Sequence, residues 1–156
     1  MISAGPKNMS GLESNILVKD WLELYPEPQS TASRLSADEV LQLLSAGKSS
    51  TILDLRNDRA PGFIRESVNV PATSISGYSN IKDQVIDKIY AANPNLNYII
   101  VHCNSSKNRA TKVAGWIQDY INDQKSENLK VAVLNEGITG WLERPEPYST
   151  FVEKYP

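Results

Sequence analysis

The chain has 156 residues, which is enough for one domain with a substantial core and too few for two. Its net charge of −2 argues against the basic excess that a nucleic-acid-binding protein normally carries. No apolar run approaches the roughly 20 residues that span a bilayer, and no secretory or mitochondrial leader is evident. We therefore expect a cytoplasmic or nuclear protein with neither a membrane nor a nucleic-acid partner.

Residues 1–34 are predicted to be an N-terminal extension that is partly helical. The first 15 residues are rich in Ser, Gly and Asn and are expected to be loose. From Leu17, apolar residues recur at helical spacing until two prolines end the pattern. Residues 36–39, Ser-Ala-Asp-Glu, have the pattern of a capping box and predict a helix that stops near Gly47.

Strands and helices are then expected to alternate. Short, mainly apolar runs predict strands at 51–56, 68–71, 97–103 and 130–134. Helical spacing predicts helices at about 79–92 and after residue 109, and residues 137–141 begin the closing segment. This alternation predicts an α/β fold with a central, mainly parallel sheet flanked by helices.

The chain contains one cysteine, Cys103, and one histidine, His102. Such a chain cannot form an internal disulfide, a Cys-x-x-Cys redox pair or a multi-thiolate zinc site, and no metal site is predicted. A protease-type Cys–His dyad needs side chains that converge from different segments, whereas neighbours on a strand point to opposite faces. A cysteine protease is therefore disfavoured.

The most informative segment is the loop from Cys103 to Arg109, between the strongest predicted strand and an amphipathic helix. Parallel α/β sheets bind ligands at the carboxyl ends of their strands. Successive backbone N–H groups in such a loop can surround an anion, and the positive end of the following helix faces the same point. The residues expected to form this cradle are Asn104, Ser105, Ser106, Lys107 and Asn108.

Arg109 would add a planar charged group that suits two oxygens of a phosphate-like ion. The same positive field favours the thiolate form of Cys103, which would then be a nucleophile near neutral pH. His102 is expected to support the loop through a hydrogen bond rather than to act as a base. The structural alternative makes Cys103 a small buried residue at a strand end and Arg109 an ordinary first residue of a helix.

Several other residues have simpler structural interpretations. Asp54 and Arg56, at the end of a predicted strand, are expected to form an ion pair or loop anchor rather than a catalytic pair. Trp141 is expected to pack in the core. Gly137 and Gly140 are expected to supply backbone freedom in a turn.

Three motifs together resemble the rhodanese superfamily: His102-Cys103-x5-Arg109, Asp54-Leu55-Arg56 and the segment Asn-Glu-Gly-Ile-Thr-Gly-Trp at 135–141. The resemblance implies a rhodanese-like three-layer fold, with the catalytic domain at residues 35–156. Sulfurtransferases of this superfamily have four residues between the loop cysteine and arginine. This chain has five, which resembles the branch of cell-division-cycle-type phosphatases and eukaryotic arsenate reductases. Within that branch, residues 105–121 are most similar to the fungal arsenate reductases.

Chemistry separates the candidate activities. Hydrolysis of a phosphate ester through a thiolate needs a general acid, but the loop contains no Asp or Glu, and Asp58 is a weak candidate elsewhere. Arsenate reduction needs no bulky alcohol to be protonated, but it needs a second thiol. This chain has none, so the thiol must be external, and the resemblance implies glutathione with glutaredoxin as partner and no bound cofactor.

We therefore predict a glutathione/glutaredoxin-coupled arsenate reductase, with a phosphatase acting on phosphate esters as the second candidate. A thiosulfate-type sulfurtransferase or a non-catalytic rhodanese-like binding module comes third. Loop length disfavours the sulfurtransferase, and the presence of both Cys103 and Arg109 disfavours a silent module. The sequence makes no prediction of oligomeric state.

Overall fold

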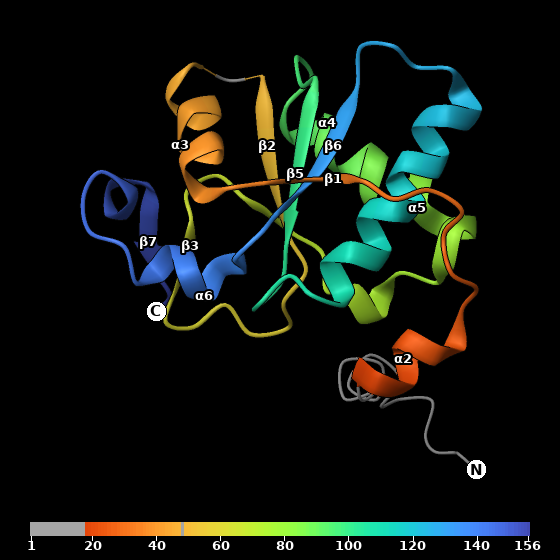
Figure 1. Ribbon diagram of the computed structural model, residues 1–156, viewed down its shortest axis with the longest axis horizontal. Coiled ribbons are helices and arrows are strands. Elements are labelled where there is room, and N and C mark those ends of the chain that lie inside the picture. Colours follow the sequence, from red (N-terminus) through yellow and green to blue (C-terminus); the bar gives the residue numbers. More distant parts are fainter. Residues whose placement is uncertain (1–17, 48) are drawn as a thin grey trace.

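A five-stranded parallel sheet forms the centre of the computed structural model, which describes residues 18–47 and 49–156 (Figure 1). The strand order is β1-β6-β5-β2-β4, and every neighbouring pair is parallel. The strands are β1 (Ser33–Leu35), β2 (Ser50–Asp54), β4 (Val68–Asn69), β5 (Tyr98–His102) and β6 (Lys130–Leu134). The predicted α/β class and parallel sheet are confirmed, while the expectations for residues 1–17 lie outside the described residues.

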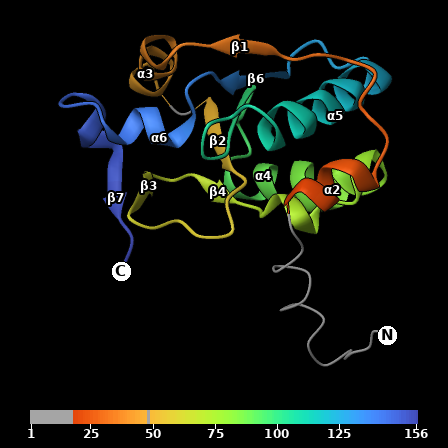
Figure 2. The same cartoon turned by 60° about the horizontal axis from the view of Figure 1, so that its bottom comes forward.

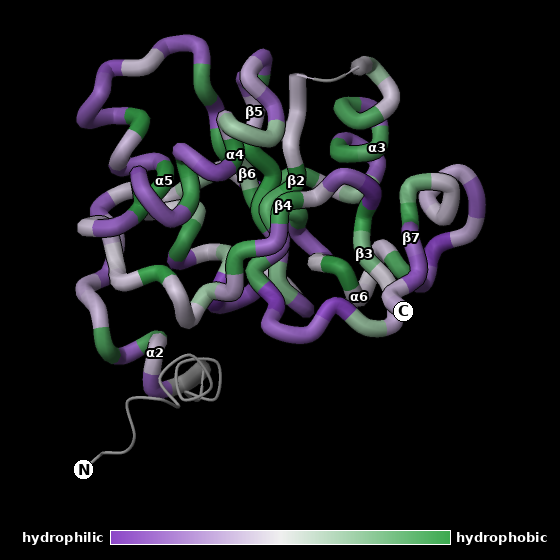
Figure 3. The backbone as a smooth tube through the Cα atoms, turned by 180° about the vertical axis from the view of Figure 1, so that it is seen from behind, coloured by the Kyte–Doolittle hydropathy of each residue, from purple (hydrophilic) through white to green (hydrophobic). Residues whose placement is uncertain are grey.

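Helices cover both faces of this sheet (Figures 1 and 2). They are α2 (Val18–Leu24), α3 (Ala37–Ser45), α4 (Asp87–Ala92), α5 (Arg109–Gln124) and α6 (Gly137–Leu142). Strand side chains alternate between the faces, as the pleat requires. Leu53 and Val101 pack in the larger cluster beneath α4 and α5, whereas Ile52 and Ile100 pack in the smaller one with α3 and α6. Figure 3 shows the hydrophobic segments gathered in the central strands.

Local sequence signals explain some elements well and others only in part. The capping box of α3 is confirmed, because Ser36 Oγ accepts from the Glu39 N–H at 3.1 Å and Glu39 Oε1 accepts from the Ser36 N–H at 2.8 Å. The helix predicted at 79–92 is instead a 3-10 turn η3 (Gly77–Asn80), a π turn η4 (Lys82–Ile86) and α4. Val85 and Ile86, both in the π turn, are buried in the core.

Short elements complete the fold. β3 (Gly62–Ile64) and β7 (Val152–Lys154) form a separate antiparallel pair. The 3-10 turns η2 (Ala72–Ser74) and η5 (Tyr148–Phe151) lie in connections. These pieces are three or four residues long, too short for hydrophobic periodicity to reveal them. No helix in the described ranges is long and apolar enough to cross a membrane.

Residues 18–34 pack against the rest of the chain without a gap at the predicted boundary. Trp21 is 1% exposed, its indole N–H donates to the Ile75 carbonyl at 2.8 Å, and its ring meets that of Trp116 edge to face at 5.7 Å. β1 itself crosses residue 34 and pairs with β6 at the edge of the sheet. The described part of the extension is therefore built into the same hydrophobic core.

Candidate active site

The loop singled out by the sequence lies at the carboxyl edge of the sheet, where β5 ends at His102 and α5 begins at Arg109. Strand register places His102 beside Asp54, the last residue of β2. Cys103 is 3% exposed and packs on the α5 side of the sheet, in the larger core cluster. His102 belongs to the strand position before it, so the two side chains leave the strand in opposite directions.

The loop backbone is held by its carbonyl groups. The N–H groups of Ile138 and Thr139, in the first turn of α6, donate to the carbonyls of Cys103 at 3.2 Å and Asn104 at 3.1 Å. The Arg34 guanidinium donates to the Ser106 carbonyl at 2.7 Å. The C=O and N–H of one trans peptide point in opposite directions. Because the carbonyls of Cys103, Asn104 and Ser106 point toward their hydrogen-bond donors, the N–H group of each following residue points away from that donor.

Those N–H groups are the donors that an anion would use. Within the described residues, the backbone N–H groups of 104–108 donate to no protein acceptor. Asn108, the N-cap of α5, makes no side-chain capping bond, so the first turn of this 16-residue helix also keeps its donors. Unpaired backbone N–H groups at a helix N-terminus are groups that commonly bind oxyanions.

Ser106 occupies a strained position at the base of the loop. Its φ is +62°, which costs a non-glycine residue about 1–2 kcal/mol, and it is fully buried. Its hydroxyl accepts from the Cys103 N–H at 3.3 Å, and its carbonyl accepts from the Thr111 hydroxyl at 3.3 Å as well as from Arg34. These contacts offset the strain and fix the loop around Cys103.

Gly137 lets α6 approach the loop closely. Its φ is +67°, and a Cβ at this position would lie 2.1 Å from the Asn104 carbonyl oxygen. Gly137 supplies the expected backbone freedom at the start of α6, and its contact with the loop is a second reason for glycine. The expectation is wrong for Gly140, which lies inside α6 without a positive φ; a Cβ there would lie 2.7 Å from Glu136 Cβ, so the position requires a small residue rather than a turn. Trp141 is fully buried and packs edge to face on Tyr148 at 5.0 Å, which confirms its place in the core.

The other residues of the segment up to Arg109 are exposed or half-buried, and two of them are positively charged. Arg109 is half-buried, and among the described residues its guanidinium forms no ion pair or hydrogen bond. Lys107 is exposed and likewise has no partner in the described ranges. Asn104, Ser105 and Asn108 are exposed. Two cations with no counter-ion among the described residues therefore lie in the segment from Cys103 to Arg109.

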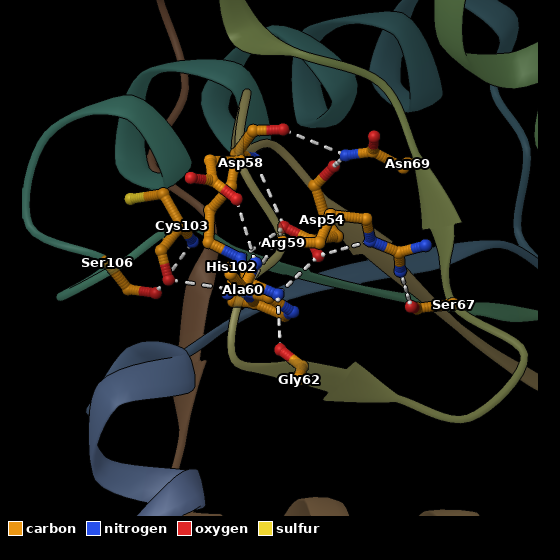
Figure 4. Close-up of polar contacts among 11 residues, drawn as sticks. Asp54, Asp58, Arg59, Ala60, Gly62, Ser67, Asn69, His102, Cys103 and Ser106 are labelled. Atoms are coloured by element: carbon orange, nitrogen blue, oxygen red, sulfur yellow. Dashed lines mark hydrogen bonds and ion pairs between the residues drawn. The ribbon is translucent and has the colours of Figure 1, made fainter. Parts of the chain in front are cut away.

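A buried ion-pair network lies beside the loop (Figure 4). Asp54 is fully buried and binds Arg56 through Nε at 3.0 Å and Nη2 at 2.8 Å, with Arg59 Nε at 3.1 Å. Burial raises the pKa of Asp54, but the hydrogen bonds from Arg56 and the surrounding positive charge outweigh it, so the pKa lies below its ordinary value. Arg56 also donates to the Gly62 carbonyl at 3.0 Å. The expected ion pair and loop anchor are both present.

His102 connects this network to the loop. It is fully buried, with Nδ1 3.2 Å from the Cys103 carbonyl oxygen and 3.9 Å from Asp54 Oδ1. Burial lowers the pKa of His102 to about 4, although the Asp54 charge opposes this. The imidazole is therefore neutral at pH 7, and its hydrogen bond with the Cys103 carbonyl is the loop support expected from the sequence.

Sequence reasoning did not identify Arg34 or Thr111 as loop residues. Arg34 lies in the segment interpreted as an extension, and neither belongs to a motif that indicates loop contact. A cavity of about 340 Å³ beside the loop is lined by Lys107, Asn108 and Thr111 on one side and Glu27 on the other. A second cavity, of about 600 Å³, surrounds the start of β2 at the opposite edge of the sheet.

Together, the parallel sheet, the cysteine loop at the end of β5 and the arginine that opens α5 define an α/β domain with a Cys-x5-Arg loop at the carboxyl edge of its sheet. A rhodanese-like domain profile matches residues 36–144, and the chain belongs to this family. No curated protein sequence matches it significantly.

Two solved structures of the same fold show its range. One is the As-Sb reductase from Leishmania major, with a TM-score of 0.58 and 20% identity over 70% of this chain and 75% of that one. The other is Ygr203w, a yeast protein tyrosine phosphatase of the rhodanese family, with a TM-score of 0.62 and 15% identity over 80% of this chain and 94% of that one. At these identities the likeness concerns the fold.

Proposed function

We propose that this protein is a cysteine-dependent oxyanion enzyme and that it reduces arsenate with external thiols. The observation that carries the proposal is the loop 104–108, which directly follows Cys103 and whose backbone N–H groups have no acceptor among the described residues. The unpaired Arg109 guanidinium supplies the charge that a tetrahedral oxyanion needs. The same fold in a Leishmania As-Sb reductase supports this assignment.

In the proposed reaction, the Cys103 thiolate attacks As(V) and forms an S–As bond, while one arsenate hydroxyl takes a proton from solvent and leaves as water. Arg109 and the loop N–H groups stabilise the negative charge on the remaining oxygens. Two external thiols, glutathione and a glutaredoxin thiol, are then oxidised to one disulfide, and As(V) gains their two electrons. As(III) is released and Cys103 returns as the thiol. Because the chain has one cysteine, no internal disulfide can serve this step.

Arsenate-dependent NADPH consumption, measured with glutathione, glutaredoxin and glutathione reductase, tests this proposal. Cys103→Ser is expected to abolish turnover without loss of fold. Arg109→Lys is expected to lose most activity, because an ammonium cannot bind two oxygens as a guanidinium does. Arg65→Lys is the matched control, since Arg65 is exposed and lines the cavity at the opposite edge of the sheet. Turnover that survives in Cys103→Ser would end the proposal.

A phosphatase is the second candidate, supported by one observation. Asp58 is exposed on the loop that follows β2, and β2 is the strand beside β5, so both loops leave the same edge of the sheet. An acid from this loop would assist poor leaving groups more than good ones. Asp58→Asn should then lose more activity on phenyl phosphate than on p-nitrophenyl phosphate. Equal losses would remove Asp58 as the acid, and hydrolysis of neither ester by the wild type would exclude this candidate.

A further inference from the structure

Residues 22–30, which precede the matched family region, lie along α5, and we call this segment the strap. Lys112, although 4% exposed, extends its ammonium to the carbonyls of Leu22 and Tyr25, the latter at 3.0 Å, and to Glu27 Oε2 at 3.1 Å. One turn further, Trp116 Nε1 donates to the Pro26 carbonyl at 3.2 Å. These contacts recur at helical spacing, so the strap packs along one face of α5.

Two further turns of α5 continue the attachment. Asp119 accepts from the Gln29 N–H at 2.9 Å, and Asn122 donates to the Ser30 hydroxyl at 3.1 Å. Gly115 lies between Lys112 and Trp116, and a Cβ there would lie 2.4 Å from Pro28 Cγ. The strap is therefore seated closely on the helix before it continues into β1 and Arg34.

Arg34 joins the end of this strap to the anion loop. Its Nη2 donates to the Ser106 carbonyl at 2.7 Å, its Nη1 to Thr111 Oγ1 at 2.9 Å, and its Nε to Asn135 Oδ1 at 2.7 Å. The three bonds reach the loop, the first turn of α5 and the segment after β6. The planar guanidinium carries its donors on three separate nitrogens in a fixed fork that matches these three acceptors, whereas all the donors of an ammonium radiate from one nitrogen.

We propose that Arg34 is a positioning residue that holds the loop 104–108 in its anion-binding conformation. It acts through Ser106, whose left-handed backbone is strained and whose hydroxyl accepts from the Cys103 N–H. Without Arg34, the Ser106 carbonyl keeps only the Thr111 hydroxyl at 3.3 Å. The peptide that presents the Lys107 N–H is then free to rotate, and the cradle loses a fixed donor. This inference rests on the proposed oxyanion site.

Calorimetric titration with inorganic phosphate and with arsenate tests the inference on the full chain. Arg34→Gln is expected to weaken binding of both ions about tenfold, as loss of a charge-assisted hydrogen bond would. Arg34→Lys should weaken binding nearly as much, and Thr111→Val should weaken it less. Arg65→Gln, which removes an exposed arginine at the far edge of the sheet, should bind like the wild type.

The binding constant separates positioning from simple stabilisation. A purely structural role would lower the melting temperature and the number of binding-competent molecules, but the remaining molecules would bind with unchanged affinity. Unchanged affinity in Arg34→Gln, or full recovery in Arg34→Lys, would overturn the positioning role. A wild-type protein that binds neither ion would overturn the proposed function instead, so the two failures are distinguishable.

Discussion

Gly137→Ala tests how closely α6 supports the anion loop. In the wild-type backbone the new Cβ would lie 2.1 Å from the Asn104 carbonyl oxygen, whereas ordinary contact begins at 3.4 Å. The obstructing atoms belong to the backbone, so a side-chain rotation cannot relieve the clash. The loop or α6 must move by about 1.3 Å. Alanine at φ +67° adds about 1–2 kcal/mol of conformational strain.

The movement falls on the residues to which we assign the proposed chemistry. Asn104 follows Cys103 directly, and its carbonyl accepts from α6 at 3.1 Å. A displacement of about 1 Å at a catalytic group can lower a rate about 100-fold. We therefore expect Gly137→Ala to lose about two orders of magnitude in kcat/KM for arsenate, measured in the NADPH-coupled assay, and to lower the midpoint of urea unfolding.

Gly47→Ala provides a matched control. Gly47 also has a positive φ, +141°, but a Cβ there would meet nothing within 4 Å. This variant should lose stability and keep its activity. If Gly137→Ala retained kcat/KM within about threefold of the wild type, the argument that α6 sets the loop geometry would be refuted.

The remaining predictions concern stability. Folded His102, with its pKa lowered by burial to about 4, binds fewer protons than the unfolded chain between pH 4 and 6.5. The free energy of unfolding should therefore be highest above pH 6.5 and fall by about 3 kcal/mol as the pH drops to 4. Urea unfolding across this range should show the fall, and His102→Asn should flatten it, because the chain has no other histidine; an equal slope in both proteins would contradict the assignment. Asp54→Asn leaves Arg56 and Arg59 without their buried counter-ion and should cost about 3–5 kcal/mol. Asp87→Asn, which removes an exposed ion pair with Lys82, should be nearly neutral, and comparable losses in the two variants would contradict the burial argument.

Local sequence patterns were sufficient to predict much of the fold and to select Cys103 and Arg109 as the centre of the candidate site. β2, β5 and β6 are buried on both faces, so their apolar runs mark them as central strands. Cys103 and Arg109 were identifiable because a strand, a short polar loop and a helix follow each other directly. The loop at the carboxyl end of such a strand, where α/β proteins bind ligands, consists of consecutive residues, so a candidate site there can be predicted from the sequence.

The helix α5 shows where local patterns fail. Its periodicity indicates one buried face, but nearly all of residues 110–117 are buried, including Lys112. The strap covers the face that an amphipathic pattern would assign to solvent. The hydrophobic periodicity of a helix shows which face is polar but not whether that face contacts water or protein. Lys112 lies on a polar face, and its ammonium binds backbone carbonyl groups instead of water.

The sequence by itself determined the α/β class, the parallel sheet and the Cys-x5-Arg loop, because each depends on residues close together in the chain. Only the tertiary structure decided how that loop is held. Arg34 lies 72 residues from Ser106 and 101 from Asn135, and Gly137 meets Asn104 from a different helix. Such contacts arise when β1, β6 and β5 come together in one sheet. The conformation of the loop therefore depends on the assembled fold, although the residue types that carry its proposed chemistry are all found in residues 103–109.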